Sequence, residues 1–77
     1  MYNGWKNRQT WNVALWLSNV ESIYHAARAL ALPGTKREAA ARLRDYAAHL
    51  WPNGATPDGD SLRGVDWTAV AESMREQ

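Results

Sequence analysis

The sequence has 77 residues, a formal net charge of +1 and no cysteine, which excludes disulfide bonds, thiolate metal sites and a cysteine nucleophile. Two histidines are too few for a histidine-based zinc site without carboxylate ligands, so we expect no metal and no cofactor. No apolar run approaches the roughly 18 residues of a transmembrane helix, and no signal peptide opens the chain. We therefore expect one cytoplasmic domain spanning residues 1–77, with no membrane partner.

Charged residues are unevenly distributed along the chain. Up to Arg44 there are seven basic and two acidic residues, whereas from Asp45 onward there are two basic and six acidic residues. Such an asymmetry orients a charged partner within a Debye length of about 8–10 Å. A chain that folds back on itself would instead carry a mixed, solvated surface.

Aromatic residues are expected to supply much of the core. Each tryptophan buries roughly 150–250 Å² of surface, and small alanines in the middle of the chain allow helices to pack closely around the rings. We expect most of the rings in the core and one left for a partner. The five tryptophans are Trp5, Trp11, Trp16, Trp51 and Trp67.

The first helix is predicted to begin at Thr10, which is a favourable N-cap residue. It is apolar almost all round, which predicts a central position in the fold. Asn19 is expected to end this helix and to cap the next one. The stripe expected to face the core comprises Trp11, Ala14, Leu15 and Ser18.

Two further helices follow, separated by Leu32-Pro33-Gly34, because proline cannot continue a helical hydrogen-bond ladder. The earlier one is predicted over residues 20–31, with Val20, Ile23, Tyr24, Ala27 and Leu30 facing inward. Thr35 and Glu38 have the spacing of a capping box, which predicts a third helix reaching Leu50. Its inward face would carry Ala39, Ala40, Leu43, Tyr46, Ala47 and Leu50.

Turn-forming residues fill positions 52–64, which predicts an internal loop rich in proline and glycine. Asp66 is the expected N-cap of a fourth helix whose apolar face carries Trp67, Val70, Ala71 and Met74. No alternating β-branched run indicates a strand. The sequence therefore predicts an all-α fold, a compact bundle of about four short helices.

Signatures of catalysis are missing from the sequence. No glycine-rich phosphate loop and no nucleophile elbow are present. Glu21 and His25 share a helix face, but a surface charge pair explains that spacing. Asp58-Gly59-Asp60 lacks the spaced ligands and the closing glutamate of a calcium loop, which favours a polar turn. We therefore expect a protein that binds a partner without catalysing a reaction.

A basic strip on the third predicted helix is the first candidate contact surface. Arg37 and Arg44 lie seven residues apart, beside Ala41 and Ala48, so they flank a flat apolar floor. A helix-turn-helix is one interpretation of this region, with the strip on DNA phosphates. The net charge of +1 disfavours a duplex-binding protein, but the strip suits an acidic protein surface or one strand of nucleic acid equally well. The candidate partner-binding residues are Arg28, Lys36, Arg37 and Arg44.

Acidic residues of the second half form the alternative contact surface. Asp58, Asp60 and Asp66 could imitate DNA phosphates and engage a positively charged channel on a partner. The choice between the basic strip and the acidic surface stays open from the sequence alone.

The segment from Tyr2 to Asn19 resembles the opening of a family of short proteins encoded by phages and mobile elements. The pattern fixes three tryptophans and several asparagines within eighteen positions, and the segment from Val65 to Trp67 is similar to the closing helix of that family. The matching positions are Asn3, Gly4, Trp5, Asn7, Thr10, Trp11, Asn12, Val13, Leu15, Trp16 and Asn19.

One branch of that family contains anti-CRISPR proteins directed against type I systems, in particular subtype I-C. The resemblance implies an inhibitor in the bacterial cytoplasm that binds a CRISPR effector complex and blocks target-DNA engagement or nuclease recruitment. We expect the protein to be a monomer. The alternatives are a small DNA-binding accessory protein of a mobile element and an interaction module without a role in defence. Asn7 and Asn12 of the motif are expected to satisfy backbone groups near the start of the first helix.

Overall fold

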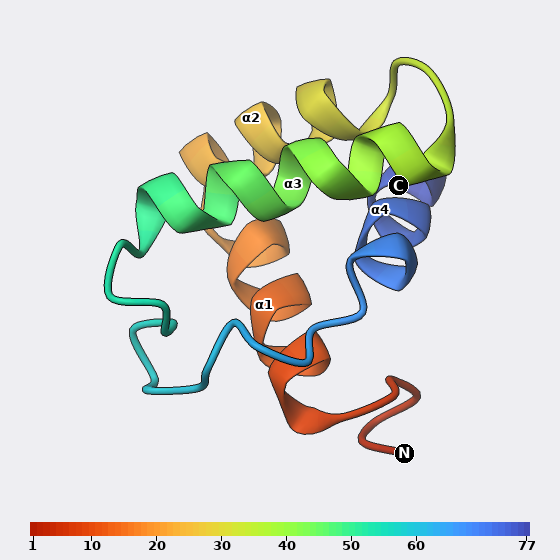
Figure 1. Ribbon diagram of the computed structural model, residues 1–77. Coiled ribbons are helices and arrows are strands. Elements are labelled where there is room, and N and C mark those ends of the chain that lie inside the picture. Colours follow the sequence, from red (N-terminus) through yellow and green to blue (C-terminus); the bar gives the residue numbers. More distant parts are fainter.

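The computed structural model describes residues 1–77 and contains four helices joined by turns and one long loop (Figure 1). The helices are α1 (Arg8–Asn19), α2 (Glu21–Ala31), α3 (Lys36–Leu50) and α4 (Trp67–Glu76). In Figure 1, α2 and α3 lie side by side, while α1 and α4 pack beneath them. Strand-like pairing is limited to two isolated bridges, so the predicted all-α fold is confirmed.

The start of α1 differs from the prediction. Asn7 is the N-cap, and its side-chain oxygen accepts a hydrogen bond from the backbone N–H of Thr10 at 2.9 Å. The Thr10 hydroxyl also donates to that oxygen, at 2.6 Å. Asn7 and Thr10 are both favourable caps, three positions apart. The helix begins at the earlier one, and Thr10 lies fully buried in its first turn.

The junction between α1 and α2 also differs in detail. Asn19 is the last residue of α1, as predicted, but it does not cap α2. Val20 occupies the N-cap position in an extended conformation and offers no side-chain hydrogen bond. As a result Val20 belongs to neither helix, and it is half-buried where a core position was predicted.

The turn between α2 and α3 confirms the predicted capping box, with Thr35 and Glu38 bonded reciprocally. Gly34 precedes it at φ +72°, where a side chain would be strained and would collide with the Glu38 carboxylate. Two arginines hold the carbonyl groups of this turn: Arg42 donates to Leu30 and Pro33, and Arg75 donates to Leu32 and Gly34. The end of α2 is therefore closed by side chains from α3 and α4.

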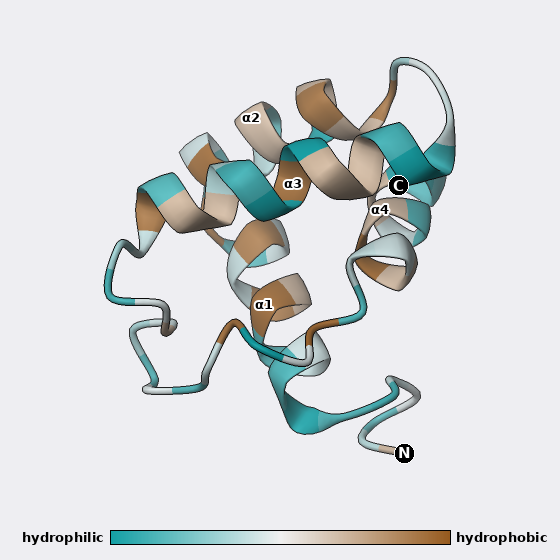
Figure 2. Ribbon diagram, viewed as in Figure 1, coloured by the Kyte–Doolittle hydropathy of each residue, from teal (hydrophilic) through white to brown (hydrophobic).

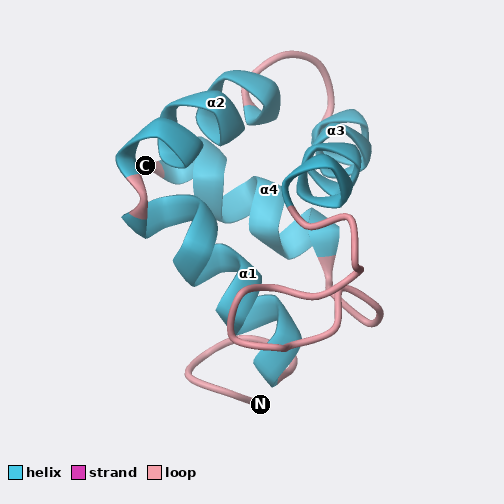
Figure 3. Ribbon diagram, turned by 90° about the vertical axis from the view of Figure 1, so that its left-hand side faces the viewer, coloured by secondary structure: helices cyan, strands magenta, loops and turns pink.

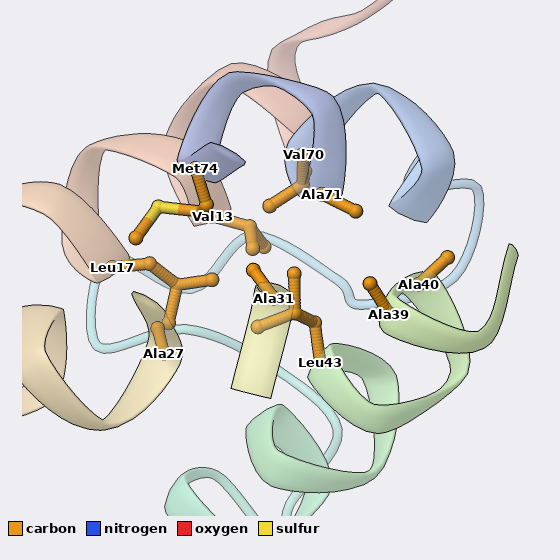
Figure 4. Packing of buried hydrophobic residues seen from close by; sticks show 10 residues of the cluster. All are labelled: Val13, Leu17, Ala27, Ala31, Ala39, Ala40, Leu43, Val70, Ala71 and Met74. Carbon is orange, nitrogen blue, oxygen red and sulfur yellow. The ribbon is translucent and has the colours of Figure 1, made fainter. Parts of the chain in front are cut away.

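Small and medium-sized aliphatic residues from all four helices make the core (Figure 4). Alanine is its commonest member, which brings the helix backbones close together. Coloured by hydropathy, α3 alternates polar and apolar bands, as expected for a helix buried along one side (Figure 2). The ten core residues are Val13, Leu17, Ala27, Ala31, Ala39, Ala40, Leu43, Val70, Ala71 and Met74.

The tryptophans do not fill the core as predicted, because all five are only partly buried. Trp5, Trp51 and Trp67 pack against the outside of the core cluster. Trp16 meets Trp51 edge to face, with the ring centres 6.5 Å apart. The centre of the core is therefore rich in alanine, and the tryptophans that contact it lie at its edge.

Leu15 is the clearest departure from the predicted core, because 37% of its surface is exposed. Val13 and Leu17, two positions away on either side, are fully buried. The stripe predicted to face inward therefore turns partly toward solvent, and the opposite side of α1 packs on the other helices.

The chain between α3 and α4 is a long loop from Trp51 to Asp66, slightly longer than the predicted 52–64 segment. Figure 3 shows it passing alongside the first turns of α1 before it enters α4. A bridge between Ala55 and Ser61 folds the middle of this loop back on itself. Asp66 ends the loop as the N-cap of α4, as predicted, and accepts from the backbone N–H of Ala69.

Candidate functional site

The asparagines of the N-terminal motif hold the long loop against α1. Asn12 is 1% exposed and lies between two residues of the loop. Its side-chain oxygen accepts from the Thr56 hydroxyl at 2.6 Å, and its side-chain amide donates to Asp58 at 2.9 Å. The Trp16 indole N–H donates to the same carboxylate oxygen at 3.1 Å. These contacts join positions more than forty residues apart in the sequence.

A second set of bonds fixes the end of the loop to the first turn of α1. The side-chain amide of Asn7 donates to the carbonyl of Gly64 at 2.8 Å. The backbone N–H of Asp66 donates to the Thr10 hydroxyl at 3.0 Å. Asn7 thus satisfies backbone groups, as expected, at the helix start and in the distant loop. The same expectation was wrong for Asn12, which bonds the side chains of Thr56 and Asp58.

The three acidic candidates all serve contacts within the protein. Asp58 accepts from Asn12 and Trp16, and Asp66 caps α4. Asp60 forms an ion pair with Arg8 at 3.0 Å, and its side chain is only 17% exposed. A surface that imitates DNA needs carboxylates free to face its partner. Asp60 and Asp66 are partly buried, and Asp58 is exposed but already accepts two hydrogen bonds.

Arg8 ties the N-terminal segment to the loop as well. Tyr2 and Trp5 pair across a two-residue turn in which Asn3 and Gly4 both have positive φ, at 49° and 86°. Asn-Gly is the favoured sequence for this tight turn. The Tyr2 ring then packs on Trp11, and the Arg8 guanidinium lies within 6 Å of both ring centres. The hydrogen bond to Asp60 raises the pKa of Arg8 above its ordinary value.

The hydrogen bonds of Asp58 are expected to make the stability of the folded protein depend on pH. The hydrogen bonds from Asn12 and Trp16 lower the pKa of Asp58 below its ordinary value, so the ionised form favours the folded state. This stabilisation is present above the unfolded pKa of about 3.9 and is lost as the pH falls through the lower folded pKa. We expect Asp58→Asn to lower the melting temperature at pH 7. Between about pH 5 and pH 2, the melting temperature of the variant should fall less than that of the unmodified protein.

Thermal melts followed by circular dichroism at several pH values test this expectation. Some acid sensitivity should remain in the variant, because the backbone N–H of Thr35 lowers the pKa of Glu38 in the same direction. If acidification lowers the melting temperature of Asp58→Asn as much as that of the unmodified protein, the Asp58 contacts do not stabilise the fold.

The predicted basic strip is open to solvent along its whole length. Arg37, Ala41, Arg44 and Ala48 are all exposed on α3. Arg37 takes part in no hydrogen bond or ion pair within the chain, and Arg44 reaches only its neighbour Asp45, at 3.9 Å. Seven residues of helix separate the two arginines by about 10 Å along the axis. The strip is therefore available to an external partner.

The other two basic candidates lie apart from the strip and have partners within the chain. Lys36 pairs with Glu72 of α4 at 2.7 Å. Arg28 donates to the carbonyl of Met74 at 3.0 Å, near the end of α4. The pairs Lys36–Glu72 and Arg8–Asp60 also join the basic first half of the chain to its acidic second half, which partly neutralises the predicted charge asymmetry.

Three hollows lie on the side of the protein where Leu15 is exposed. The middle one, of about 240 Å³, is lined by Trp5, Trp11, Ala14, Leu15, Ser18, Ser73 and Gln77. A hollow of about 150 Å³ shares Leu15 with it and reaches Trp16, Asn19, Val20 and Asp58. A third, of about 290 Å³, shares Trp5 and Ser73 with it and reaches Gly4, Ala69, Glu72 and Glu76. Because neighbouring hollows share wall residues, the three lie next to one another, and together they are here called the α1 groove.

The remaining polar pair singled out in the sequence lies on the surface. His25 and Glu21 approach to 3.7 Å with both side chains largely exposed, so they form a solvated charge pair, as predicted. Elsewhere, no three histidine, aspartate or glutamate side chains are grouped in a way that could hold a metal ion. None of the four helices has the length and apolar character needed to cross a membrane.

Comparison with known proteins gives a family but no activity. The profile of a family described as a family of unknown function (DUF7249) matches residues 1–75. The chain belongs to this family. No curated protein and no solved structure matches it. The DUF7249 match covers the N-terminal motif, the long loop and most of α4, and hydrogen bonds join the motif to the loop and to the start of α4.

Two features of this DUF7249 protein escaped prediction from the sequence. The α1 groove was missed because Trp11, Ala14 and Leu15 have the spacing of a core stripe. The pairing of Asn12 with Thr56 and Asp58 was missed because nothing local to either segment indicates it. One signal was present: asparagine is a poor choice inside a helix unless its side chain has a partner.

Proposed function

We propose that this protein is a non-enzymatic inhibitor of the anti-CRISPR kind. It binds a type I-C CRISPR effector complex in the bacterial cytoplasm and blocks target-DNA engagement or nuclease recruitment. The resemblance of residues 2–19 to a phage-encoded family supports the identity of the partner. The exposed strip formed by Arg37, Ala41, Arg44 and Ala48 is the observation that carries the binding role.

The strip has the chemistry of a protein-binding surface. Its two arginines present planar groups that can grip carboxylates through paired hydrogen bonds. Between them, Ala41 and Ala48 leave a flat floor on which a partner can approach without obstruction. Arg37 has no partner within the chain, so binding breaks no existing contact of that side chain. A small protein without catalytic groups can inhibit a large complex by occupying such a contact surface.

Reversing both charges, as in Arg37→Glu with Arg44→Glu, should weaken association with the effector complex by about 2–5 kcal/mol or more. The reason is that the acidic groups of the partner would then face like charges at a desolvated contact. Isothermal titration calorimetry against the purified complex gives the affinity, and circular dichroism checks the fold. Both positions lie outside the core, so the melting temperature should change little.

The matched control is Lys6→Glu with Arg63→Glu, which changes the net charge by the same amount. Both side chains are exposed and lie outside the strip. If the control weakens binding as much as the strip variant, the effect comes from overall charge and the strip is not the contact. Unchanged affinity in the strip variant would likewise remove it as a binding site.

A second candidate function, direct DNA binding by a mobile-element accessory protein, is favoured by the same arginine pair. Two arginines about 10 Å apart on an open helix face could contact phosphates of one strand. An electrophoretic mobility shift with generic duplex and single-stranded DNA, at about 50 and 200 mM salt, separates the two candidates. A shift that disappears at the higher salt and in the strip variant would replace the inhibitor proposal with this one.

A further inference from the structure

Two of the hollows in the α1 groove are mostly apolar, whereas the hollow beside Glu72 and Glu76 is mostly polar. The middle of the groove is walled by Trp5, Trp11, Ala14 and Leu15, and three of these are large apolar side chains. Leu15 is shared by two of the hollows, so it stands as a ridge between them. Every hollow on this protein belongs to the same groove. Large apolar side chains that line a concave place make a candidate binding surface.

Acidic side chains mark both ends of the groove, and no basic side chain lines it. Asp58 lies at the end near Asn19, and its hydrogen bonds come from the neutral groups of Asn12 and Trp16. Glu72 and Glu76 lie at the other end. Lys36 neutralises Glu72, whereas Glu76 has no ion-pair partner. Each end of the groove therefore carries a carboxylate that forms no ion pair within the chain, although the positive charge of Arg8 also acts on Asp58.

We propose that the α1 groove docks an amphipathic helix of a partner protein, with an apolar ridge in its centre and a lysine or arginine toward each end. The ridge would fill the hollows on either side of Leu15, and the basic residues would approach Asp58 and Glu76. Such a helix needs apolar side chains at spacings of three and four residues. This docking surface shares no residue with the basic strip, and it does not depend on the partner being a CRISPR effector.

Charge disfavours a dimer packed groove to groove and disfavours anionic occupants. A second copy of this chain, packed groove to groove about a twofold axis, would bring acidic ends against acidic ends in either orientation of the two helices. Nucleic acids and anionic lipid surfaces carry phosphates, which the carboxylates at both ends would repel. A basic helix is the occupant that gains from both the apolar middle and the acidic ends.

The test uses a designed helical peptide of about 14 residues, which spans about 21 Å. It carries leucines on one face, two lysines at each end and no aromatic residue. Because Trp5, Trp11 and Trp16 line the groove, binding should shift the tryptophan fluorescence of the protein, which the peptide does not contribute to. A second peptide with glutamates in place of the lysines should bind at least about tenfold more weakly.

Two leucine variants locate the binding site. Leu15→Ala should weaken binding of the lysine peptide about tenfold, because it removes the protein side chain that stands between the two hollows. Leu32→Ala is the matched control, since Leu32 is 48% exposed but lies in the turn after α2. It should leave the affinity unchanged. Circular dichroism of both variants confirms that the fold is intact.

Three results would overturn the proposal: no saturable binding of the lysine peptide, equal binding of both peptides, or equal effects of the two leucine variants. Sedimentation of the protein alone gives a further outcome. A concentration-dependent dimer that Leu15→Ala disrupts would assign the groove to a second copy instead. The strip variant should bind the lysine peptide normally, so failure of the effector proposal and failure of this one are distinguishable.

Discussion

Leu17→Ala is expected to destabilise the protein by about 2–5 kcal/mol, the range for truncating a fully buried leucine. Leu17 is completely buried in the core between α1 and α2, whereas Leu15 on the same helix is 37% exposed. A single core in a domain of this size supplies only about 3–5 kcal/mol. The Leu17 variant should therefore be largely unfolded at 25 °C, and Leu15→Ala should remain folded.

Urea denaturation followed by circular dichroism measures both free energies of unfolding. The pair is well matched, because both substitutions replace leucine by alanine within one helix and have the same effect on helix propensity. We expect Leu15→Ala to cost less than about 1.5 kcal/mol. Equal costs at the two positions would contradict the orientation of α1 described above, and with it the groove.

Asn12→Asp should be the most damaging change of a single polar group. It keeps the shape of the side chain but replaces the amide that donates to Asp58 by a second carboxylate. Position 12 is 1% exposed, so the new carboxylate oxygen is buried without a hydrogen-bond donor, at a cost of about 1–3 kcal/mol. Repulsion between the two carboxylates adds to this cost at pH 7.

The pH dependence of this variant should have the opposite sign to that of the unmodified protein. Two carboxylates in contact share a proton, which raises the folded pKa of the pair above the unfolded value of about 4. The destabilisation is then present above the raised pKa and is relieved as the pH falls through it. Between pH 7 and about pH 5 the variant should gain stability relative to the unmodified protein.

Asn19→Asp provides the control, because Asn19 is exposed at the end of the same helix and the change in charge is identical. Melting temperatures of the three proteins at pH 7 and pH 5 give the comparison. If the Asn12 and Asn19 variants respond alike, the contact between Asn12 and the long loop contributes nothing to stability.

Local signals predicted three of the four helices well. The capping box of Thr35 and Glu38 and the N-cap Asp66 act through hydrogen bonds to residues three positions away, so the sequence contains the whole interaction. The inward positions of α3 were also predictable, because Ala39, Leu43 and Ala47 repeat at helical spacing among polar neighbours. Periodicity is informative where a helix has two chemically different sides.

The orientation of α1 was not predictable, because this helix does not have two chemically different sides. A helix that is apolar almost all round does not specify which side faces the core, and the choice depends on where the other helices lie. Val13 and Leu17 meet them, which leaves Leu15 toward solvent. Likewise, the choice of Asn7 over Thr10 as N-cap follows from a distant contact, since the Thr10 hydroxyl accepts from the backbone of Asp66.

The two candidate contact surfaces also differ in how far the sequence alone could predict them. The strip of Arg37 and Arg44 follows from helical spacing alone and lies where it was expected. The involvement of Asp58 and Asp60 with α1 could not be predicted, because both contacts join residues more than forty positions apart. A charge pattern shows which side chains are available for pairing, and the fold decides which of them are already paired.

Direct association with a purified type I-C effector complex tests the proposed function most directly. Calorimetry should show saturable binding with a fixed stoichiometry, and a mobility shift assay should show either loss of the effector's target-DNA complex or loss of nuclease recruitment to it. The protein alone should not shift the DNA. No detectable association at concentrations well above those at which the effector binds its target would contradict the proposal, whichever surface is considered.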